Sequence, residues 1–224
     1  MIRDKLPTNW IHVYDSLRFE VSTSLGRSLQ KIPKLTKTDY LHVGCGDSIL
    51  DGFLNTDVFT NTLADSGVDL RFPLPFQDAS FRGIYAHHVV EHLSYDNARF
   101  FFKEARRVLN TGGIFRVVVP DVEKFIKKYI EYPDSSNSTA LLIPEWHHSP
   151  EWQTSLEVLD YVFRDNYFNQ HRSAWDFYTL NYRLEEAGFK EIQQVECGIS
   201  DDKKLCCLDK VDWQDQSLYV EAKV

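Results

Sequence analysis

From residue 40 onward, the chain alternates short apolar runs with segments whose apolar residues recur at helical spacing. The run at 114–119 is apolar except for Arg116, as expected of a strand that is buried on both faces. Strands that are separated by helices usually run parallel to one another. The alternation therefore predicts an α/β fold with a mostly parallel sheet.

Periodicity and capping residues define the individual elements. Ser94 and Asp121 are the expected N-caps of helices over 95–109 and 122–130, and the glycines at 112–113 are expected to end the first of these. Ser173 and Asp176 indicate a capping box for a last helix, which Gly188 ends. Strands are predicted at 40–43, 53–58, 68–70, 83–86, 114–119, 189–197 and 217–223, and further helices at 8–24 and 156–163.

Two segments stand outside this alternation. Residues 1–38 hold the first helix and a basic stretch that Pro33 interrupts, which predicts an N-terminal helical appendage. The main domain is then expected over residues 39–224. Within it, residues 132–172 begin with a loop signal rich in Ser and Asn and continue with many aromatic residues. This stretch is predicted to be a variable insert or lid.

Composition excludes several classes of function. The 25 basic and 33 acidic residues give a net charge of −8, which argues against binding of a nucleic-acid backbone. No apolar run is long enough to span a bilayer, and the first residues lack the apolar core of a secretory signal. The four cysteines show no metal-binding or disulfide spacing, so we expect a cytoplasmic location.

The turn after the first strand reads Gly44, Cys45, Gly46 and permits close approach of a ligand to the backbone. Ile49 occupies the place of the third glycine of a dinucleotide fingerprint, and no Gly-Lys-Ser/Thr follows. The turn therefore favours a ligand that has a nucleoside but no pyrophosphate, although a plain tight turn has the same sequence. Asp57 ends the second strand, where a carboxylate can accept hydrogen bonds from both ribose hydroxyls or simply face solvent.

Several segments in order resemble class I S-adenosylmethionine-dependent methyltransferases of the type-11 group. The closest likeness is to a small subgroup that often accompanies synthesis of surface polysaccharides. The resemblance runs from about residue 40 to 224. It rests on residues 41–46, 53–57, 69–76, 84–93, 107–113 and 171–189, and on the closing run 217–222.

This resemblance implies a doubly wound Rossmann-like sheet, mostly parallel with an antiparallel last strand, and with helices on both faces. It also implies S-adenosylmethionine as the cofactor and assigns residues to it. Gly44 and Gly46 would line the methionine part, and Asp57 would hold the ribose. Asp69 and Leu70 would frame the adenine, and the backbone at His87 would lie near the sulfonium. Three positions depart from the usual pattern, which has an acid or Asn at 42, a small glycine at 48 and an acid at 82: His42, Ser48 and Arg82.

The resemblance further implies transfer of the methyl group to a small-molecule or glycan acceptor, by direct displacement and most simply to a hydroxyl. A hydroxyl acceptor needs a base near neutral pH, and the candidates are His92, His171 and His88 in that order. Candidate acceptor-binding residues are Arg172, Trp146, His147, Trp175 and Tyr178. The same histidines are equally compatible with capping and packing, and the aromatic residues with a second small core.

Two alternatives to this function follow from the same residues. His42 and Arg82 are also compatible with a methyltransferase fold that binds a ligand and has lost catalysis. His88, Glu91 and His92 match H-x-x-E-H, which on a helix would place two histidines on one face around zinc. A zinc hydrolase is therefore the third interpretation.

Overall fold

A computed structural model describes residues 38–58, 63–133, 154–164 and 171–224. Of the first 37 residues it describes only 10, 13, 14, 17, 20, 21, 23 and 24, all of them helical, in agreement with the helix predicted at 8–24. Trp146 and His147 lie outside the described residues. The division into appendage, main domain and insert remains a prediction. None of the helices in the described part is long and apolar enough to cross a membrane.

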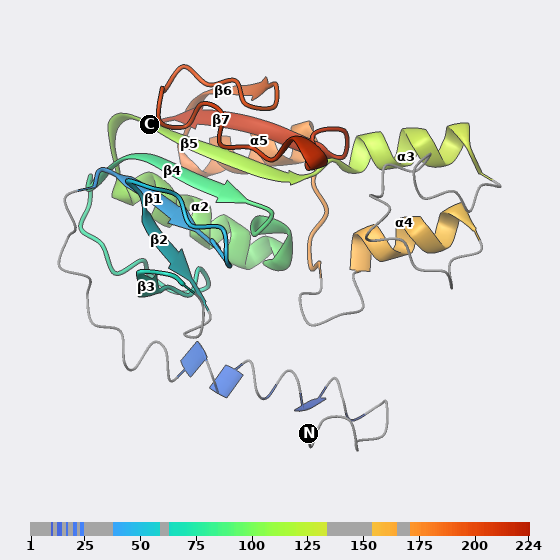
Figure 1. The fold of residues 1–224 in the computed structure, drawn as a ribbon, viewed down its shortest axis with the longest axis horizontal. Helices are drawn as coiled ribbons and strands as arrows, with labels where there is room; N and C mark the ends of the chain where they lie inside the picture. Colours follow the sequence, from blue (N-terminus) through green and yellow to red (C-terminus); the bar gives the residue numbers. More distant parts are fainter. Residues whose placement is uncertain are drawn as a thin grey trace.

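Seven strands form one sheet in the order β3-β2-β1-β4-β5-β7-β6 (Figure 1). All neighbouring pairs are parallel except those of β7, which runs antiparallel to both β5 and β6. The predicted doubly wound fold with an antiparallel last strand is thus confirmed. The strands are β1 (Tyr40–Val43), β2 (Leu54–Asp57), β3 (Ser66–Gly67), β4 (Phe81–His87), β5 (Leu109–Pro120), β6 (Lys190–Val195) and β7 (Ser217–Lys223).

One face of the sheet is covered by α2 (Tyr95–Val108) and α5 (Phe177–Ala187). Ser94 begins α2, because its hydroxyl accepts a hydrogen bond from the Asn97 backbone N–H. The apolar side chains of α2 then recur every three to four residues and bury one stripe against the strands. Phe101 and Phe102 are fully buried in this core.

The opposite face differs from the prediction of helices on both faces. Among the described residues, it is covered by the loop 196–216 between β6 and β7, which we call the cover loop. Leu205 of this loop is fully buried against Tyr40, Tyr85 and Tyr219. The segment between β1 and β2 is too short for a crossover helix of ordinary length, so the cover loop takes its place.

Buried charges hold the cover loop to the sheet. Arg116 on β5 is fully buried and pairs with Asp209 of the loop and, at 2.8 Å, with Glu221 on β7. Asp209 also accepts hydrogen bonds from Tyr85 Oη at 3.1 Å and from the Gly198 backbone N–H at 2.7 Å. Because these groups are removed from water, each depends on the others for its hydrogen bonds.

Three local predictions were wrong. The glycines at 112–113 do not cap α2, which ends at Val108, because this stretch pairs with the C-terminus as part of β5. Ser173 does not cap α5; Asp176 does, by accepting from the Thr179 backbone N–H, while the Ser173 hydroxyl accepts from Trp175 Nε1. The third strand, predicted at 68–70, lies at 66–67 instead. The helix α3 (Val122–Glu131) buries Phe125 alone among its apolar side chains.

The Asp121 cap of α3 and the Gly188 end of α5 are confirmed. A further helix, α4 (Ser155–Arg164), lies beside α3 beyond the end of the sheet (Figure 1). Short 3₁₀ turns occur at η2 (Val90–His92) and η4 (Val211–Trp213). The turn η2 follows shortly after β4 and carries Glu91 and His92.

Candidate functional site

The two glycines of the turn after β1 serve different purposes. Both have positive φ, +63° at Gly44 and +50° at Gly46. A Cβ added at Gly44 would collide with the Val89 side chain, so this glycine permits the turn to pack against the segment after β4. A Cβ added at Gly46 would meet nothing within 4 Å. The backbone at Gly46 is therefore open to a ligand.

Two buried polar side chains flank this turn. Asp57 at the end of β2 accepts a hydrogen bond from the Gly46 backbone N–H at 2.9 Å, so it fixes the turn. His42 Nδ1 lies 3.1 Å from Asn55 Oδ1, which also accepts from the Leu50 N–H. That oxygen can only accept, so Nδ1 carries the proton and Nε2 is left as an acceptor. Burial lowers the pKa of His42, which keeps the ring neutral.

A cavity of about 250 Å³ lies beside the turn, at the carboxyl ends of β1 and β4. The glycine turn, His42, Tyr85 and His87 line one side of it. The cover loop lines the other side with Lys210 and Trp213. Lys210 Nζ donates to Ser48 Oγ at 2.9 Å, so an ammonium group stands at the mouth of the turn.

His87 is a neutral polar group in this cavity. Burial first, and then the charge of His88, lower the pKa of His87 to about 3. Its buried Nε2 has no hydrogen-bond partner among the described residues. A buried polar atom of this kind in a cavity wall indicates a polar ligand atom.

The residues predicted to frame an adenine lie on the far side of β2. Asp69 is buried, and its carboxylate is held by Arg71, with Nη2 and Oδ2 2.9 Å apart. Arg71 also reaches Glu20 of the N-terminal helical segment at 2.6 Å. Leu70 is buried in the main core. The structure therefore gives Asp69 a structural partner within the chain, and its contact with an adenine remains a prediction.

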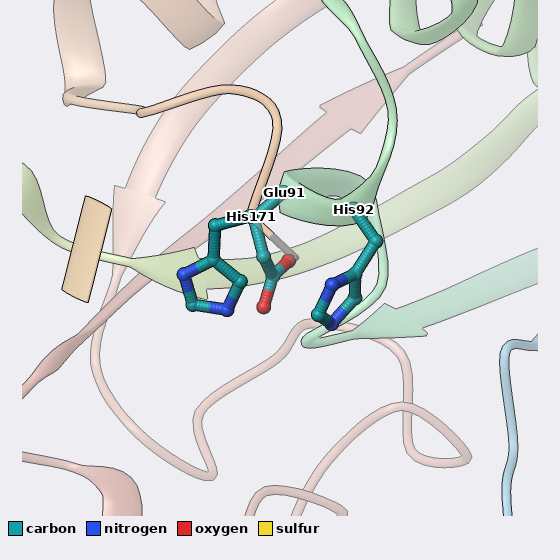
Figure 2. Close-up of side chains that lie close together, drawn as sticks. All are labelled: Glu91, His92 and His171. Atoms are coloured by element: carbon teal, nitrogen blue, oxygen red, sulfur yellow. The ribbon is translucent and has the colours of Figure 1, made fainter. Parts of the chain in front are cut away.

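A second group of side chains lies at the carboxyl end of β4. We call Glu91, His92 and His171 the Glu–His–His cluster; the two imidazole rings flank the Glu91 carboxylate (Figure 2). One ligand atom from each of the three residues lies within 4.8 Å of the others. The centroids of the two rings are 5.0 Å apart.

Backbone hydrogen bonds bring these segments together although they are 80 positions apart in sequence. The Glu91 carbonyl accepts from the Arg172 N–H at 2.7 Å and from the Ser173 N–H at 3.1 Å. His171 is further fixed by a 2.6 Å contact between its Nδ1 and the Val162 carbonyl on α4. The cluster is thus built by main-chain contacts and does not depend on surface side chains.

Glu91 is 1 % exposed and its carboxylate is ionised. Burial raises the pKa of Glu91, but the hydrogen bond from His88 and the charges of His88, His92 and His171 outweigh it and lower the pKa to about 2. His88 Nδ1 lies 3.1 Å from Glu91 Oε1. Oε2 has no hydrogen-bond partner among the described residues.

The geometry contradicts the zinc-hydrolase interpretation. Residues 90–92 make a single 3₁₀ turn, and His88 precedes it with a φ of +50°, so His88 and His92 do not share a helical face. Both ring nitrogens of His88 already have partners, since Nε2 lies 2.8 Å from Ser217 Oγ. His171 takes the place beside Glu91 and His92 that the motif assigns to His88.

Three of the predicted acceptor-binding residues lie in the described part, and the structure does not bring them together in one pocket. Trp175 is fully buried, packs edge-on against Phe102 and Tyr95, and belongs to the core, so that assignment was wrong. Tyr178 is 77 % exposed on α5 and does not line the cavity. Arg172 has an exposed side chain next to the cluster. Arg172 therefore remains a candidate for an acceptor contact.

Comparison with known proteins agrees with this arrangement. Residues 41–117 match a family model described as a methyltransferase domain. A SAM-dependent methyltransferase of Thermotoga maritima, described as a possible histamine N-methyltransferase, shares the fold with a TM-score of 0.52 at 14 % identity, over 96 % of each chain. No curated protein matched the sequence.

Two further solved structures give TM-scores of 0.48 at 15 % identity. One is a SAM-dependent methyltransferase from Archaeoglobus fulgidus, matched over 92 % of this chain and 94 % of that one. The other is an S-adenosylmethionine-dependent methyltransferase from Mesorhizobium loti, matched over 92 % and 100 %.

Residues 41–117 are thus similar to a methyltransferase domain, and the described residues share the fold of a SAM-dependent methyltransferase. The residues around the glycine turn fit a polar ligand. Gly46, with its open face, and His87, whose Nε2 has no hydrogen-bond partner among the described residues, line a cavity that can take a polar ligand, and Asp57 holds the Gly46 backbone N–H beside it.

The sequence interpretation missed the contribution of the cover loop. Lys210 and Trp213 lie in a polar stretch without a motif, and they reach the cavity because Asp209, next to Lys210, is tied to the buried Arg116. The arginine inside the apolar run 114–119 was the available signal, because a buried cation requires an acidic partner elsewhere.

Proposed function

We propose that the protein is a methyltransferase that uses S-adenosylmethionine as its cofactor and transfers the methyl group to a hydroxyl of a small-molecule or glycan acceptor. The observation that supports the proposal is the Glu–His–His cluster, which adjoins the cavity beside the glycine turn: His88 lines the cavity, and its Nδ1 lies 3.1 Å from Glu91 Oε1. Bound S-adenosylmethionine supplies a methyl group on a positively charged sulfur. An amine acceptor needs little help to attack it, whereas a hydroxyl has to lose its proton.

A bond forms between the acceptor oxygen and the methyl carbon while the carbon–sulfur bond breaks, and the electron pair of that bond stays on sulfur. The hydroxyl proton leaves to a base. His171 is suited to take it, because its Nδ1 lies 2.6 Å from the Val162 carbonyl and so carries the proton, which leaves the Nε2 lone pair as the acceptor. The ionised Glu91 carboxylate then stabilises the protonated ring.

The residues on the cofactor side would hold the methyl donor by its charges and hydroxyls. His42 offers the Nε2 lone pair to the ammonium group, and Lys210 offers a cation to the carboxylate of the methionine part. Asp57 accepts from the ribose. This division explains how a neutral His42 can stand where an acid is usual, since Lys210 already provides a second charge contact.

The test uses S-adenosylmethionine labelled in its methyl group and a panel of acceptors with hydroxyl, amine or thiol groups. We expect label in hydroxyl acceptors only. His92→Ala and His171→Ala should each lower turnover by about 100-fold or more, with the affinity for S-adenosylhomocysteine unchanged. Asp96→Asn, an exposed change on the first turn of α2, is the control and should have wild-type turnover. Transfer to amines alone, or full activity of both histidine variants, would contradict the proposal.

A further inference from the structure

The Glu–His–His cluster has the composition of a metal site. Two imidazoles and one carboxylate form a common three-ligand set of catalytic zinc sites, and the same set binds other first-row metals. Such a site leaves at least one coordination position open for a substrate oxygen. The three donors here come from two segments that main-chain hydrogen bonds hold together.

The state of each donor suits a cation. Glu91 is 1 % exposed, and its Oε2 has no hydrogen-bond partner among the described residues, so a buried negative charge points into the cluster. An isolated ionised carboxylate is costly to bury, and a cation would offset that cost. The other oxygen, Oε1, lies 3.1 Å from His88 Nδ1, and His88 Nε2 lies 2.8 Å from Ser217 Oγ.

His171 is oriented as metal-binding histidines usually are. Its Nδ1 lies 2.6 Å from the Val162 carbonyl, which can only accept, so Nδ1 carries the proton and Nε2 presents a lone pair. A second-shell carbonyl of this kind fixes the tautomer and the ring plane of a ligand histidine. The ring is thus set for coordination through Nε2 before any ion binds.

The spacing requires only small movements. Zinc with bonds of about 2.0–2.2 Å places tetrahedral ligands roughly 3.4 Å apart. The three donor atoms lie within 4.8 Å of one another. Side-chain rotations that move each donor atom by about 1 Å would therefore bring them to the spacing that zinc requires. The main-chain contacts of Glu91, Arg172 and Ser173 stay intact during such rotations.

We propose that Glu91, His92 and His171 bind one divalent transition-metal ion of the zinc class, which receives the acceptor hydroxyl. The inference rests on the proposed function, since it gives the ion that hydroxyl as substrate. The positive charge of the ion lowers the pKa of the hydroxyl and orients its oxygen. With the ion bound, the lone pairs of His92 and His171 are used for coordination. The proton of the acceptor hydroxyl then leaves to water.

The experiment titrates the chelator-treated full-length protein with Zn²⁺ alone, against a chromophoric competitor, and repeats the titration with Co²⁺ for its visible absorption. We expect one ion per chain and the bands of a four- or five-coordinate cobalt site. His171→Ala and Glu91→Gln should each weaken zinc binding by more than the roughly 10- to 100-fold typical of an outer-shell change. Affinity for S-adenosylhomocysteine shows that each variant is folded.

Two control variants separate this site from its rivals. His88→Gln alters the motif histidine, which contacts Glu91 but is not one of the three proposed ligands, so zinc affinity should fall no more than in an outer-shell change. Replacing Cys206 and Cys207 by serine removes the only adjacent thiol pair and should leave zinc binding unchanged. A wild-type protein that binds no ion, or a greater loss in His88→Gln or the cysteine variant than in His171→Ala, would overturn the proposal.

The outcome also separates this inference from the proposed function. Methyl transfer to hydroxyls by a protein that binds no zinc and resists chelators would remove the ion and leave the acceptor assignment intact. Zinc binding at the cluster without methyl transfer to any hydroxyl would support the metal site and refute the hydroxyl acceptor.

Discussion

The buried Arg116–Asp209 pair makes the cofactor pocket depend on the stability of the cover loop. Asp209→Ala would leave the fully buried guanidinium with Glu221 and two backbone carbonyls, at 2.8, 2.7 and 3.3 Å. It would also remove the acceptor for Tyr85 Oη and for the Gly198 N–H. Removing one partner of a buried ion pair costs about 3–5 kcal/mol.

For a chain of this size, that loss corresponds to a fall in Tm of roughly 6–20 °C. The assay is thermal and urea unfolding followed by circular dichroism. The affinity for S-adenosylhomocysteine should fall as well, because Lys210 and Trp213 line the cavity and Asp209 holds their loop against the sheet. Asp215→Ala, an exposed change in the same loop, should stay within about 0.5 kcal/mol of the wild type. A Tm for Asp209→Ala equal to that of Asp215→Ala would refute this account of the loop.

Three further predictions follow from the site. His87 binds a proton below about pH 6.5 in the unfolded chain but only near pH 3 in the folded one, so this residue should cost the protein about 2 kcal/mol of stability between pH 6.5 and 5. His87→Gln should abolish this loss in pH-dependent urea melts, and an unchanged pH dependence would contradict the burial of a neutral His87. Gly44→Ala should destabilise the fold more than Gly46→Ala, because only the former collides with Val89; equal losses in urea would count against it. Trp175→Ala should lower the free energy of unfolding by about 3–5 kcal/mol in the same melts, as expected for a core residue. A loss under 1 kcal/mol would contradict its place in the core.

Local sequence patterns predicted much of this fold because their causes are local. The strand β7 was expected at residues 217–223 and is found there, since its run of apolar side chains needs no knowledge of its partners. Asp121 and Gly188 were identified from hydrogen bonds and backbone conformations that involve only a few neighbours. The errors arose where distant pairing decides, as at Gly112, whose N–H donates to the Val224 carbonyl.

The candidate site was less predictable for the same reason. The glycine turn and Asp57 have local signatures at the ends of β1 and β2. The partnership of Glu91 with His171 depends on two main-chain hydrogen bonds across 80 positions, and the contribution of Lys210 depends on the buried Arg116. Sequence alone indicated His88 as the partner of His92 because adjacent residues in a motif suggest a helix, and this segment forms a single 3₁₀ turn.

The assignment of the cofactor pocket can be tested directly by calorimetric titration of the purified protein with S-adenosylhomocysteine. The account predicts one binding site per chain in the wild type. It predicts about 10- to 150-fold weaker binding in Asp57→Ala, from a loss of about 1.5–3 kcal/mol for a charge-assisted contact, with Asp96→Asn unchanged. No binding by a folded wild-type protein, or equal affinity in Asp57→Ala, would contradict it.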